Sequence, residues 1–219
     1  ILSIDQSTQG TKAMLFDAAG QLTARVDRAH RQYVNEKGWV SHDLDEILSN
    51  TLAVARDVLA KADVRPEQIV AVGISNQRET VAAWNRTTGE PVGKAIVWQC
   101  ARAKDICEKL TAHADTVQQK TGIPLSPYFS APKMAWILQN EPGAAELAEK
   151  NELCFGTIDS FLVSHLTEEK AFKTDYSNAS RTQLFNIHTL QWDEELCRIY
   201  GVPETCLPEV CMSDSVFGY

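Results

Sequence analysis

The sequence has no long hydrophobic run and no excess of basic residues. No apolar stretch approaches the roughly 20 residues of a membrane-spanning helix, and the apolar start at residues 1–5 is too short for a signal peptide. Asp and Glu number 29 against 21 Lys and Arg, which gives a formal net charge of −8. We therefore expect neither a membrane nor a nucleic acid as a partner, because no basic field is present to attract phosphates.

Patterns for metal binding, disulfides and several kinds of catalysis are also absent. No C-x-x-C pair occurs among the six cysteines, and the five histidines show no metal spacing. Neither a G-x-S-x-G string nor the phosphate-binding string G-x-x-x-x-G-K-[ST] is present. The sequence therefore predicts free, buried thiols and a reducing, cytoplasmic location, and it gives no support to a hydrolase or a metalloenzyme.

What is present is the composition of an ordinary globular protein, with 44% hydrophobic and 23% charged residues. The N-terminal part alternates between short apolar runs and turn residues, which predicts strands at residues 1–5, 12–17 and 21–28. Strands joined by such short connections must be antiparallel neighbours, because parallel pairs need long crossovers.

A helix and a further strand are expected next. Asp43 followed by Glu46 is typical of a helix start, and apolar residues then recur at helical spacing through residue 59. The apolar run at residues 69–74 is typical of a strand buried on both faces. This order excludes a dinucleotide-binding start, in which the first strand leads directly into a helix. The remaining predicted elements are strands at 80–84, 94–98 and 153–155 and helices at 102–120, 133–139, 144–149, 160–166 and 193–200.

The polar segment at residues 5–12 follows the first predicted strand. Its small hydroxyl residues and backbone N–H groups can converge on phosphate oxygens. Asp5 can hold Mg²⁺ through water, and Lys12 adds a positive charge. The segment predicts a phosphate-binding hairpin, and an ordinary polar hairpin with a capping Asp is the alternative that these residues leave open.

A second polar segment, residues 75–80, follows the apolar run. Consecutive polar groups at the end of a core strand are costly unless they face a cleft. Arg78 and Glu79 there offer a donor fork beside an acceptor, which suits vicinal hydroxyl groups. Trp98 and Tyr128 are candidates for the aromatic wall of a sugar site. The alternative for Arg78 and Glu79 is an ion pair on the surface at the end of the strand. The alternative for Trp98 and Tyr128 is packing in the core.

These segments, in their order along the chain, resemble the FGGY carbohydrate kinases. Eight matches in one order are more specific than any single motif, and they extend through essentially the whole chain. The resemblance implies an α/β, ribonuclease-H-like (actin-like ATPase) fold with a mixed sheet flanked by helices. The matching strings are IDQSTQGTKAMLFD, GWVSHD, VGISNQRET, AIVWQC, PYFSAPKMAWIL, FGTIDSFL, TDYSNASRTQLFNIHTLQWD and LPEV.

The resemblance also implies two such domains, with ATP and the polyol meeting between them. Residues 1–219 would be the N-terminal, polyol-binding domain, and the C-terminal domain would lie outside this chain. The ending SDSVFGY, without a cap or polar tail, agrees with such a cut. The family's catalytic base, an Asp of the second domain, would then be outside the chain as well. Neither Asp159 nor Asp175 is a candidate to replace it.

The activity implied is ATP-dependent phosphorylation of a small polyol or sugar, with glycerol as the first candidate and glycerol 3-phosphate as its product. By resemblance, Arg78, Glu79 and Tyr128 hydrogen-bond the polyol hydroxyl groups, and Trp98 packs on its carbon backbone. Asp5 would lie near Mg²⁺. The residues implied at the ATP phosphates are Thr8, Gln9, Gly10 and Lys12.

Four residues depart from the family's usual hairpin: Ser7 replaces Gly, Gln9 and Gly10 replace hydroxyl residues, and Lys12 replaces Arg. Ser7 needs a different backbone torsion if the glycine served a positive φ, and Lys12 lacks the bidentate fork of Arg. Another polyol or ketose, such as erythritol or a xylulose-like sugar, is therefore a close alternative substrate. An actin-like ATPase and a non-catalytic sugar-binding module are more distant alternatives, and a homo-oligomer is left open.

Overall fold

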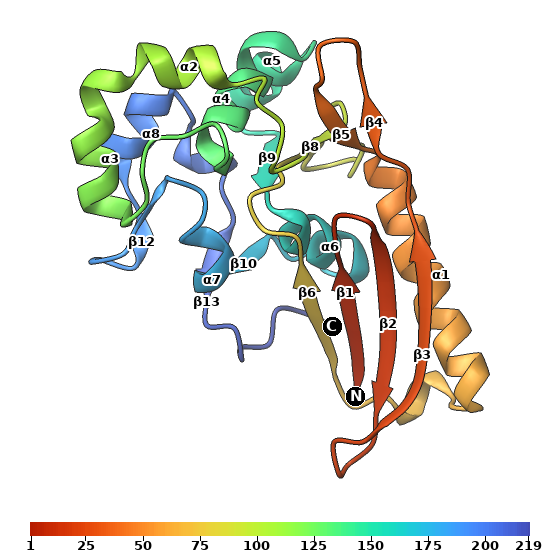
Figure 1. Cartoon of the computed structure of the whole chain (residues 1–219). Coiled ribbons are helices and arrows are strands. Elements are labelled where there is room, and N and C mark those ends of the chain that lie inside the picture. Colours follow the sequence, from red (N-terminus) through yellow and green to blue (C-terminus); the bar gives the residue numbers. More distant parts are fainter. The chain divides into compact units, whose positions relative to one another are not determined.

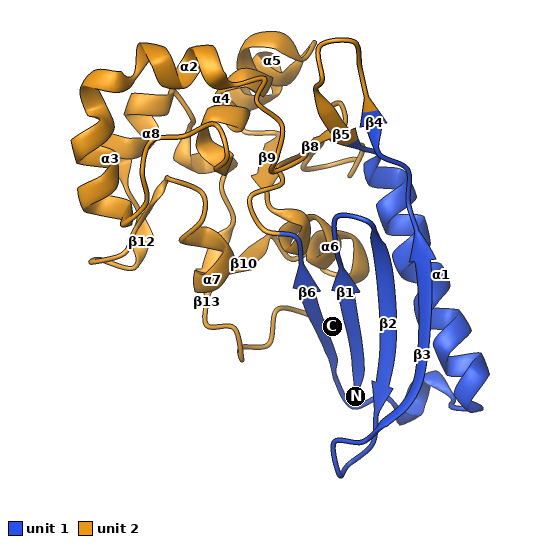
Figure 2. Cartoon of the chain, in the orientation of Figure 1, with its two compact units in different colours: residues 1–33, 42–77 blue, residues 34–41, 78–219 orange.

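The computed structural model describes residues 1–219, and the chain divides into two compact units. Unit 1 comprises residues 1–33 and 42–77, and unit 2 comprises residues 34–41 and 78–219 (Figure 2). Each unit has a hydrophobic core of its own. None of the helices combines the length and the apolar character that a bilayer crossing requires.

Unit 1 is built on a four-stranded mixed sheet with the strand order β3-β2-β1-β6 (Figure 1). β1 (Leu2–Gln6) pairs antiparallel with β2 (Gly10–Phe16), which pairs antiparallel with β3 (Leu22–Ala29). β6 (Val72–Asn76) lies parallel to β1 on its other side. The three predicted antiparallel strands are therefore confirmed.

One face of this sheet is covered by α1 (Leu44–Ala62). The helix begins where the sequence predicts, because the Asp43 carboxylate accepts a hydrogen bond of 3.2 Å from the N–H of Glu46. Side chains alternate between buried and partly buried along β1 and β2, so each strand turns one face to α1. A short 3-10 helix, Pro66–Gln68, connects α1 to β6. The core of unit 1 consists of Leu2, Ile4, Ala13, Leu15, Ala24, Val54 and Val58.

β6 differs from its prediction. The apolar run at residues 69–74 predicts a strand buried on both faces, but Val70 is 84% exposed and Val72 is 54% exposed. β6 is the edge strand of the sheet and bonds to β1 on one side only. The prediction of a strand is therefore confirmed, whereas the prediction of burial on both faces is wrong. An apolar run reports the preference of its side chains and not how many neighbours the strand has.

Unit 2 packs short helices around a larger apolar core. The predicted helix at 102–120 is broken near Thr111, whose hydroxyl donates to the carbonyl of Glu108 at 2.7 Å and so competes with helix continuation. The other predicted helices are confirmed. The helices are α2 (Lys104–Lys109), α3 (Ala114–Thr121), α4 (Ser130–Asn140), α5 (Ala144–Glu149), α6 (Ile158–Leu166), α7 (Tyr176–Ala179) and α8 (Glu194–Tyr200), with 3-10 turns at Thr111–His113 and Glu204–Cys206.

The remaining strands are short and form small sheets of two or three strands. All six cysteines are free, as the sequence predicts. The three-stranded sheet is β4 (Tyr33–Val34), β5 (Val40–His42) and β8 (Ala95–Ile96), and the pairs are β7 (Ala82–Asn85) with β9 (Leu153–Gly156), β10 (Lys173–Asp175) with β13 (Glu209–Cys211), and β11 (Phe185–Asn186) with β12 (Gln191–Trp192).

Gly10 marks a close approach of β2 to β3. A Cβ at Gly10 would lie 2.5 Å from the carbonyl oxygen of Arg28, whereas a Cβ at Gly73 on β6 would meet nothing within 4 Å. We expect Gly10→Ala to lower the free energy of unfolding by about 1–3 kcal/mol, because the backbone must shift. Gly73→Ala, the matched control, should change it by less than about 0.5 kcal/mol. Urea denaturation measures both, and equal effects would contradict the close approach.

Candidate functional site

The first group of predicted site residues lies on the β1–β2 hairpin of unit 1. Asp5 on β1 is paired in register with Lys12 on β2, and the Lys12 Nζ donates to the Asp5 Oδ2 at 2.8 Å. Thr8 and Gln9 form the turn, and Gly10 begins β2. The structure therefore brings all five of these predicted residues onto one hairpin.

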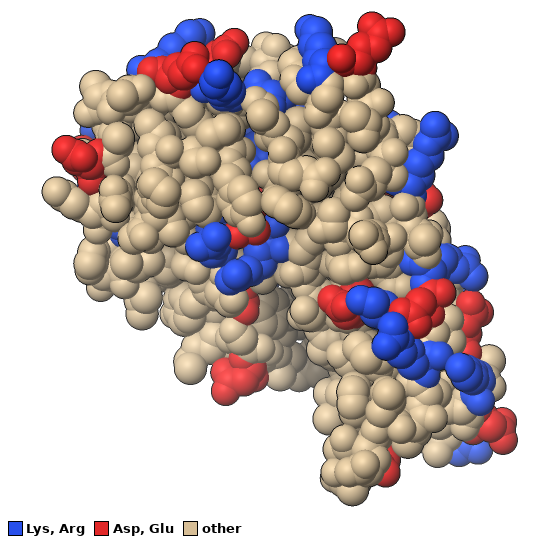
Figure 3. All heavy atoms as spheres, viewed as in Figure 1, with Lys and Arg blue, Asp and Glu red and all other residues tan.

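Charges on unit 1 are paired locally and do not gather into a field of one sign. The Lys12 and Asp5 side chains are each about one-third exposed, at 32% and 31%. On β3, Arg25 and Asp27 form another ion pair at 2.7 Å. Figure 3 shows basic and acidic side chains side by side over β3 and α1. The binding of an anion at this hairpin therefore depends on groups in direct contact with the anion.

The carbonyl oxygens of the turn are all used within unit 1. Because carbonyl oxygens repel phosphate oxygens, their engagement in internal bonds removes one obstacle to an anion at the turn. The bonds are Gln6 Nε2 to Ser7 O at 2.9 Å, Gln32 Nε2 to Thr8 O at 3.2 Å, the His30 N–H to Gln9 O at 3.3 Å, and the Ser7 N–H and Oγ to Gly10 O at 2.8 and 2.9 Å.

A buried chain of polar side chains supports the same turn. Gln6 and His42 are fully buried, and Gln77 is 8% exposed. The Gln77 Nε2 donates to the Gln6 Oε1 at 3.0 Å and lies 3.2 Å from the His42 Nδ1. Because the amide is the donor, we assign the His42 Nδ1 as acceptor and place the proton of the neutral ring on Nε2. The support of the turn therefore needs a neutral His42.

Burial keeps His42 neutral. Burial is the main cause that lowers the pKa of His42 to about 4, and the neighbouring His30, whose ring centroid lies 4.4 Å away, contributes in the same direction. Burial also lowers the pKa of His30, although the nearby Glu46 acts in the opposite direction. The isolated histidines of the sequence contain no pattern that predicts this arrangement, because their partners come from distant segments.

The second group of predicted site residues lies in unit 2, and its centre is Glu79. This residue is 5% exposed and has a φ of 64°, which is uncommon outside glycine. Its carbonyl accepts a hydrogen bond of 3.2 Å from the Ser130 Oγ, and its Oε1 accepts one of 2.6 Å from the Arg181 Nε. Arg78 is exposed and forms no ion pair within the chain. Glu79 therefore pairs with Arg181 and not with its neighbour Arg78.

Trp98 and Tyr128 lie together in unit 2. Their ring centroids are 5.4 Å apart, and Tyr128, two residues before the start of α4, is 39% exposed. The backbone N–H of Trp98 donates to the hydroxyl of Thr80, the residue after Glu79, at 3.1 Å. Arg78, Glu79, Trp98 and Tyr128, which are the residues predicted to bind a polyol, thus share one region of unit 2, and we call them the polyol group.

Arg181 is a partner of Glu79 that no local sequence pattern indicates. Its guanidinium lies 5.0 Å from the ring centroid of Phe129, in addition to its ion pair with Glu79. The two charged residues are separated by 102 positions in the chain. No local pattern in one sequence predicts a pair at that separation.

Asp159 and Asp175 have structural roles, as expected. Asp159 is buried on α6 and accepts hydrogen bonds from the hydroxyls of Thr157 and, at 2.7 Å, Thr174. Burial raises the pKa of Asp159 to about 6. Asp175 accepts the N–H of Asn178 at 2.7 Å and so caps α7. Both carboxylates are engaged by the chain's own groups.

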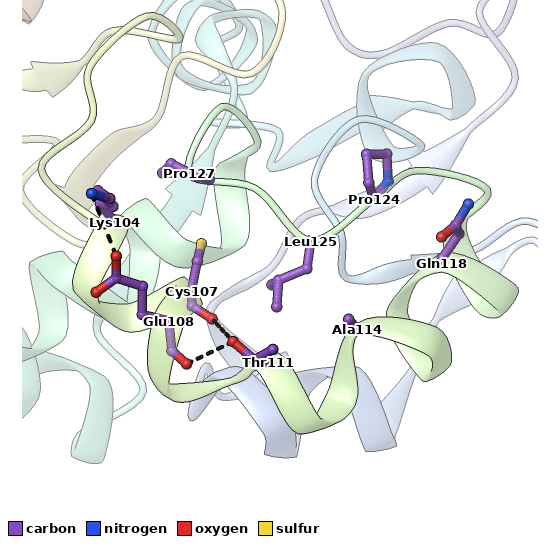
Figure 4. Close-up of a pocket in the computed structure, with 9 residues that line it drawn as sticks. All are labelled: Lys104, Cys107, Glu108, Thr111, Ala114, Gln118, Pro124, Leu125 and Pro127. Carbon is purple, nitrogen blue, oxygen red and sulfur yellow. Dashed lines mark hydrogen bonds and ion pairs between the residues drawn. The ribbon is translucent and has the colours of Figure 1, made fainter.

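A pocket of about 370 Å³ lies in unit 2 and contains none of the predicted site residues (Figure 4). Burial raises the pKa of the Cys107 thiol in its wall to about 11, so a reactive thiolate is not expected there. Pro127, in the wall of this pocket, is followed directly in the chain by Tyr128. The lining residues are Lys104, Cys107, Glu108, Thr111, Ala114, Gln118, Pro124, Leu125 and Pro127.

Comparison with known proteins decides the family. Residues 1–219 match the family described as "FGGY family of carbohydrate kinases, N-terminal domain". The chain belongs to this family. It is 47% identical over 221 residues to a glycerol kinase of Pseudothermotoga lettingae, an alignment that covers 100% of this chain and 44% of that protein. The chain therefore spans less than half the length of the relatives that it matches.

Solved structures agree with this FGGY assignment. The Plasmodium falciparum glycerol kinase, crystallised with ADP, superposes with a TM-score of 0.91 at 37% identity and covers 99% of this chain and 44% of its own. A ligand-bound xylulose kinase from Lactobacillus acidophilus, at 24% identity, shares the fold with a TM-score of 0.83 and covers 96% of this chain and 41% of its own. The predicted α/β, actin-like fold is therefore confirmed.

Two of the departures from the usual FGGY hairpin, Ser7 and Lys12, have different consequences. Ser7 does not have a positive φ, so serine occupies the glycine position without backbone strain. Lys12 forms a single contact with one oxygen of Asp5, where the fork of an arginine is able to make two. The serine is therefore accommodated by the fold, whereas the lysine changes the local charge geometry.

The buried His42 predicts an acid-sensitive stability. Its folded pKa of about 4 lies below the ordinary value of 6.5, so the unfolded chain binds the proton first as the pH falls, and stability present above pH 6.5 is lost towards pH 4. Because of this residue, we expect the free energy of unfolding of the wild type to fall by about 2 kcal/mol from pH 7 to pH 5. His42→Gln, which keeps an acceptor for Gln77, should remove that part of the loss.

Urea denaturation at the two pH values measures the difference. The exposed His113→Gln serves as the matched control and should keep the wild-type dependence. Equal pH dependence in the wild type and in His42→Gln would contradict the assignment of a neutral, buried ring.

Proposed function

We propose that this chain is the N-terminal, polyol-binding domain of an ATP-dependent kinase that converts glycerol to glycerol 3-phosphate. The observation that carries the proposal is the polyol group, in which a buried carboxylate held by Arg181 accompanies an exposed arginine and two aromatic rings. Identity of 47% to a glycerol kinase supports glycerol over a larger sugar.

In this proposal each member of the polyol group has a separate task. Arg78 donates hydrogen bonds to two hydroxyl oxygens, and the Glu79 carboxylate accepts a hydrogen bond from a hydroxyl group. Tyr128 adds its phenolic hydroxyl, and the ring of Trp98 covers the C–H groups of the polyol. Arg181 holds the Glu79 side chain in one orientation. Together these contacts hold one terminal hydroxyl of the polyol in place for reaction.

The hairpin at residues 5–12 is the proposed ATP-phosphate site, with Thr8, Gln9, Gly10 and Lys12 as its contacts. It suits this task because its carbonyl oxygens are bonded internally and Lys12 carries the only positive charge on its two strands near the turn. Phosphoryl transfer depends mainly on positioning and on charge stabilisation, which backbone N–H groups, a hydroxyl and an ammonium group can provide.

Asp5 is the proposed contact for Mg²⁺. Lys12 occupies its Oδ2, and a single carboxylate with water molecules is a common Mg²⁺ environment in phosphate-binding sites. When bound, Mg²⁺ would neutralise charge on the nucleotide phosphates. We propose that the catalytic base belongs to a C-terminal domain, because the relatives are more than twice as long and Asp159 and Asp175 are both engaged. The six unpaired cysteines support a cytoplasmic location.

A substrate panel tests this function. The full-length protein, assayed with ATP and glycerol, erythritol or xylulose, should show its highest kcat/KM with glycerol. Residues 1–219 alone should bind polyol without turnover, because the proposed base is not in them. A preference for the ketose would overturn the glycerol assignment, and turnover by residues 1–219 alone would overturn the two-domain account.

Two variants separate the roles of the two groups. In the full-length protein, Arg78→Ala should raise the KM for glycerol by about tenfold or more and leave the KM for ATP nearly unchanged, because a charged hydrogen bond to the polyol is lost. Thr8→Val should lower kcat and leave glycerol affinity, measured by calorimetry, nearly intact. Equal effects of Arg78→Ala on both KM values, or a loss of glycerol binding in Thr8→Val, would count against these roles.

A further inference from the structure

Lys133 is a buried ammonium group that forms no ion pair. It lies in the first turn of α4 and is 0% exposed. Its Nζ donates to three consecutive carbonyl oxygens, those of Pro127, Tyr128 and Phe129, at 2.7, 2.5 and 2.9 Å. An ammonium group has three N–H donors, so every donor of Lys133 is directed at this one segment.

We propose that Lys133 is a positioning residue of the polyol site, which holds residues 127–129 in place and thereby orients the Tyr128 side chain towards the polyol. Lys133 itself does not touch the polyol. This inference rests on the proposed function, because it assigns Tyr128 to that site.

Packing alone does not hold this segment. The pocket of about 370 Å³ borders it, with Pro124, Leu125 and Pro127 in its wall (Figure 4). Tyr128 is 39% exposed, and its ring contacts are those with Trp98 and Phe129. The N-terminus of α4, which follows directly, has no side-chain cap. A segment with a hollow on one side and an exposed tyrosine needs polar bonds to keep one conformation.

The energetic cost of Lys133 indicates that its donors are needed. Burial is the main cause that lowers the pKa of Lys133 to about 7, and Arg102 contributes in the same direction. Glu79, Cys100 and Cys107 act in the opposite direction. An apolar side chain of similar length would fill the same place without desolvating a charge. What such a side chain would lack is the three donors, and three carbonyl oxygens would then lose their partner.

Substitution at Lys133 in the full-length protein tests the proposal. Lys133→Met keeps the length and removes the donors, and it should raise the KM for glycerol by about tenfold while the KM for ATP stays unchanged. Lys133→Gln, which retains two N–H donors, should give an intermediate KM. The matched control is Met134→Ala, because Met134 is buried on the same helix and is 1% exposed. It should lower stability and leave both KM values unchanged.

A double-mutant cycle with Tyr128→Phe distinguishes positioning from general destabilisation. If Lys133 acts through Tyr128, the double variant should have nearly the same glycerol KM as Tyr128→Phe alone. Additive effects on KM would overturn the proposal. So would equal KM increases in Lys133→Met and Met134→Ala, or the failure of both Lys133 variants to fold while Met134→Ala folds, since Lys133 would then serve the core of the unit.

Amide hydrogen exchange gives a readout that needs no substrate. The amides of Tyr128 and Phe129 should exchange faster in Lys133→Met and at the wild-type rate in Met134→Ala. Unchanged exchange in Lys133→Met would overturn the proposal whatever the substrate is. Faster exchange in a protein that does not phosphorylate glycerol would contradict the proposed function and retain the role of Lys133 in ordering the segment.

Discussion

Hydrogen bonding of β1 to a strand on each side is the constraint on which unit 1 depends. β1 bonds antiparallel to β2 and parallel to β6, so its register fixes what lies beside each of its residues. Asp5 is thereby placed opposite Lys12, and Gln6 is placed beside the end of β6, where Gln77 reaches it. A slip of one residue would turn Gln6 from the interior to the surface and separate the ion pair. The chemistry of the hairpin therefore follows from backbone pairing.

In both units, buried polar side chains hold predicted site residues in place through hydrogen bonds. In unit 1, His42 and Gln77 are linked to the turn through Gln6, which donates to the Ser7 carbonyl. In unit 2, Arg181 holds Glu79. A buried donor or acceptor without a partner is costly, so each of these networks permits few arrangements. The residues proposed to contact a ligand therefore gain their orientation from buried partners within the chain.

Local sequence signals were sufficient for much of the secondary structure and for the candidate residues. The Asp43 cap, the strands of unit 1 and the hairpin at residues 5–12 all depend on neighbours in sequence, and all of them form as predicted. The helix expected at residues 102–120 is interrupted because Thr111 bonds to the preceding turn, a competition that apolar periodicity does not report. The burial of β6 was misjudged for a related reason, since an apolar run does not state how many strands flank it.

The sequence by itself determined the FGGY family and the α/β class, because family motifs are residue types at fixed local spacings. The resemblance to that family also supplied the residues proposed for the chemistry. Only the tertiary structure decided their partners. Glu79 pairs with Arg181 across 102 positions, and Lys133 turns its ammonium group into a buried segment where a core helix would ordinarily carry an apolar side chain. Ion pairs and buried hydrogen bonds are set by distance in space, which a single sequence does not contain.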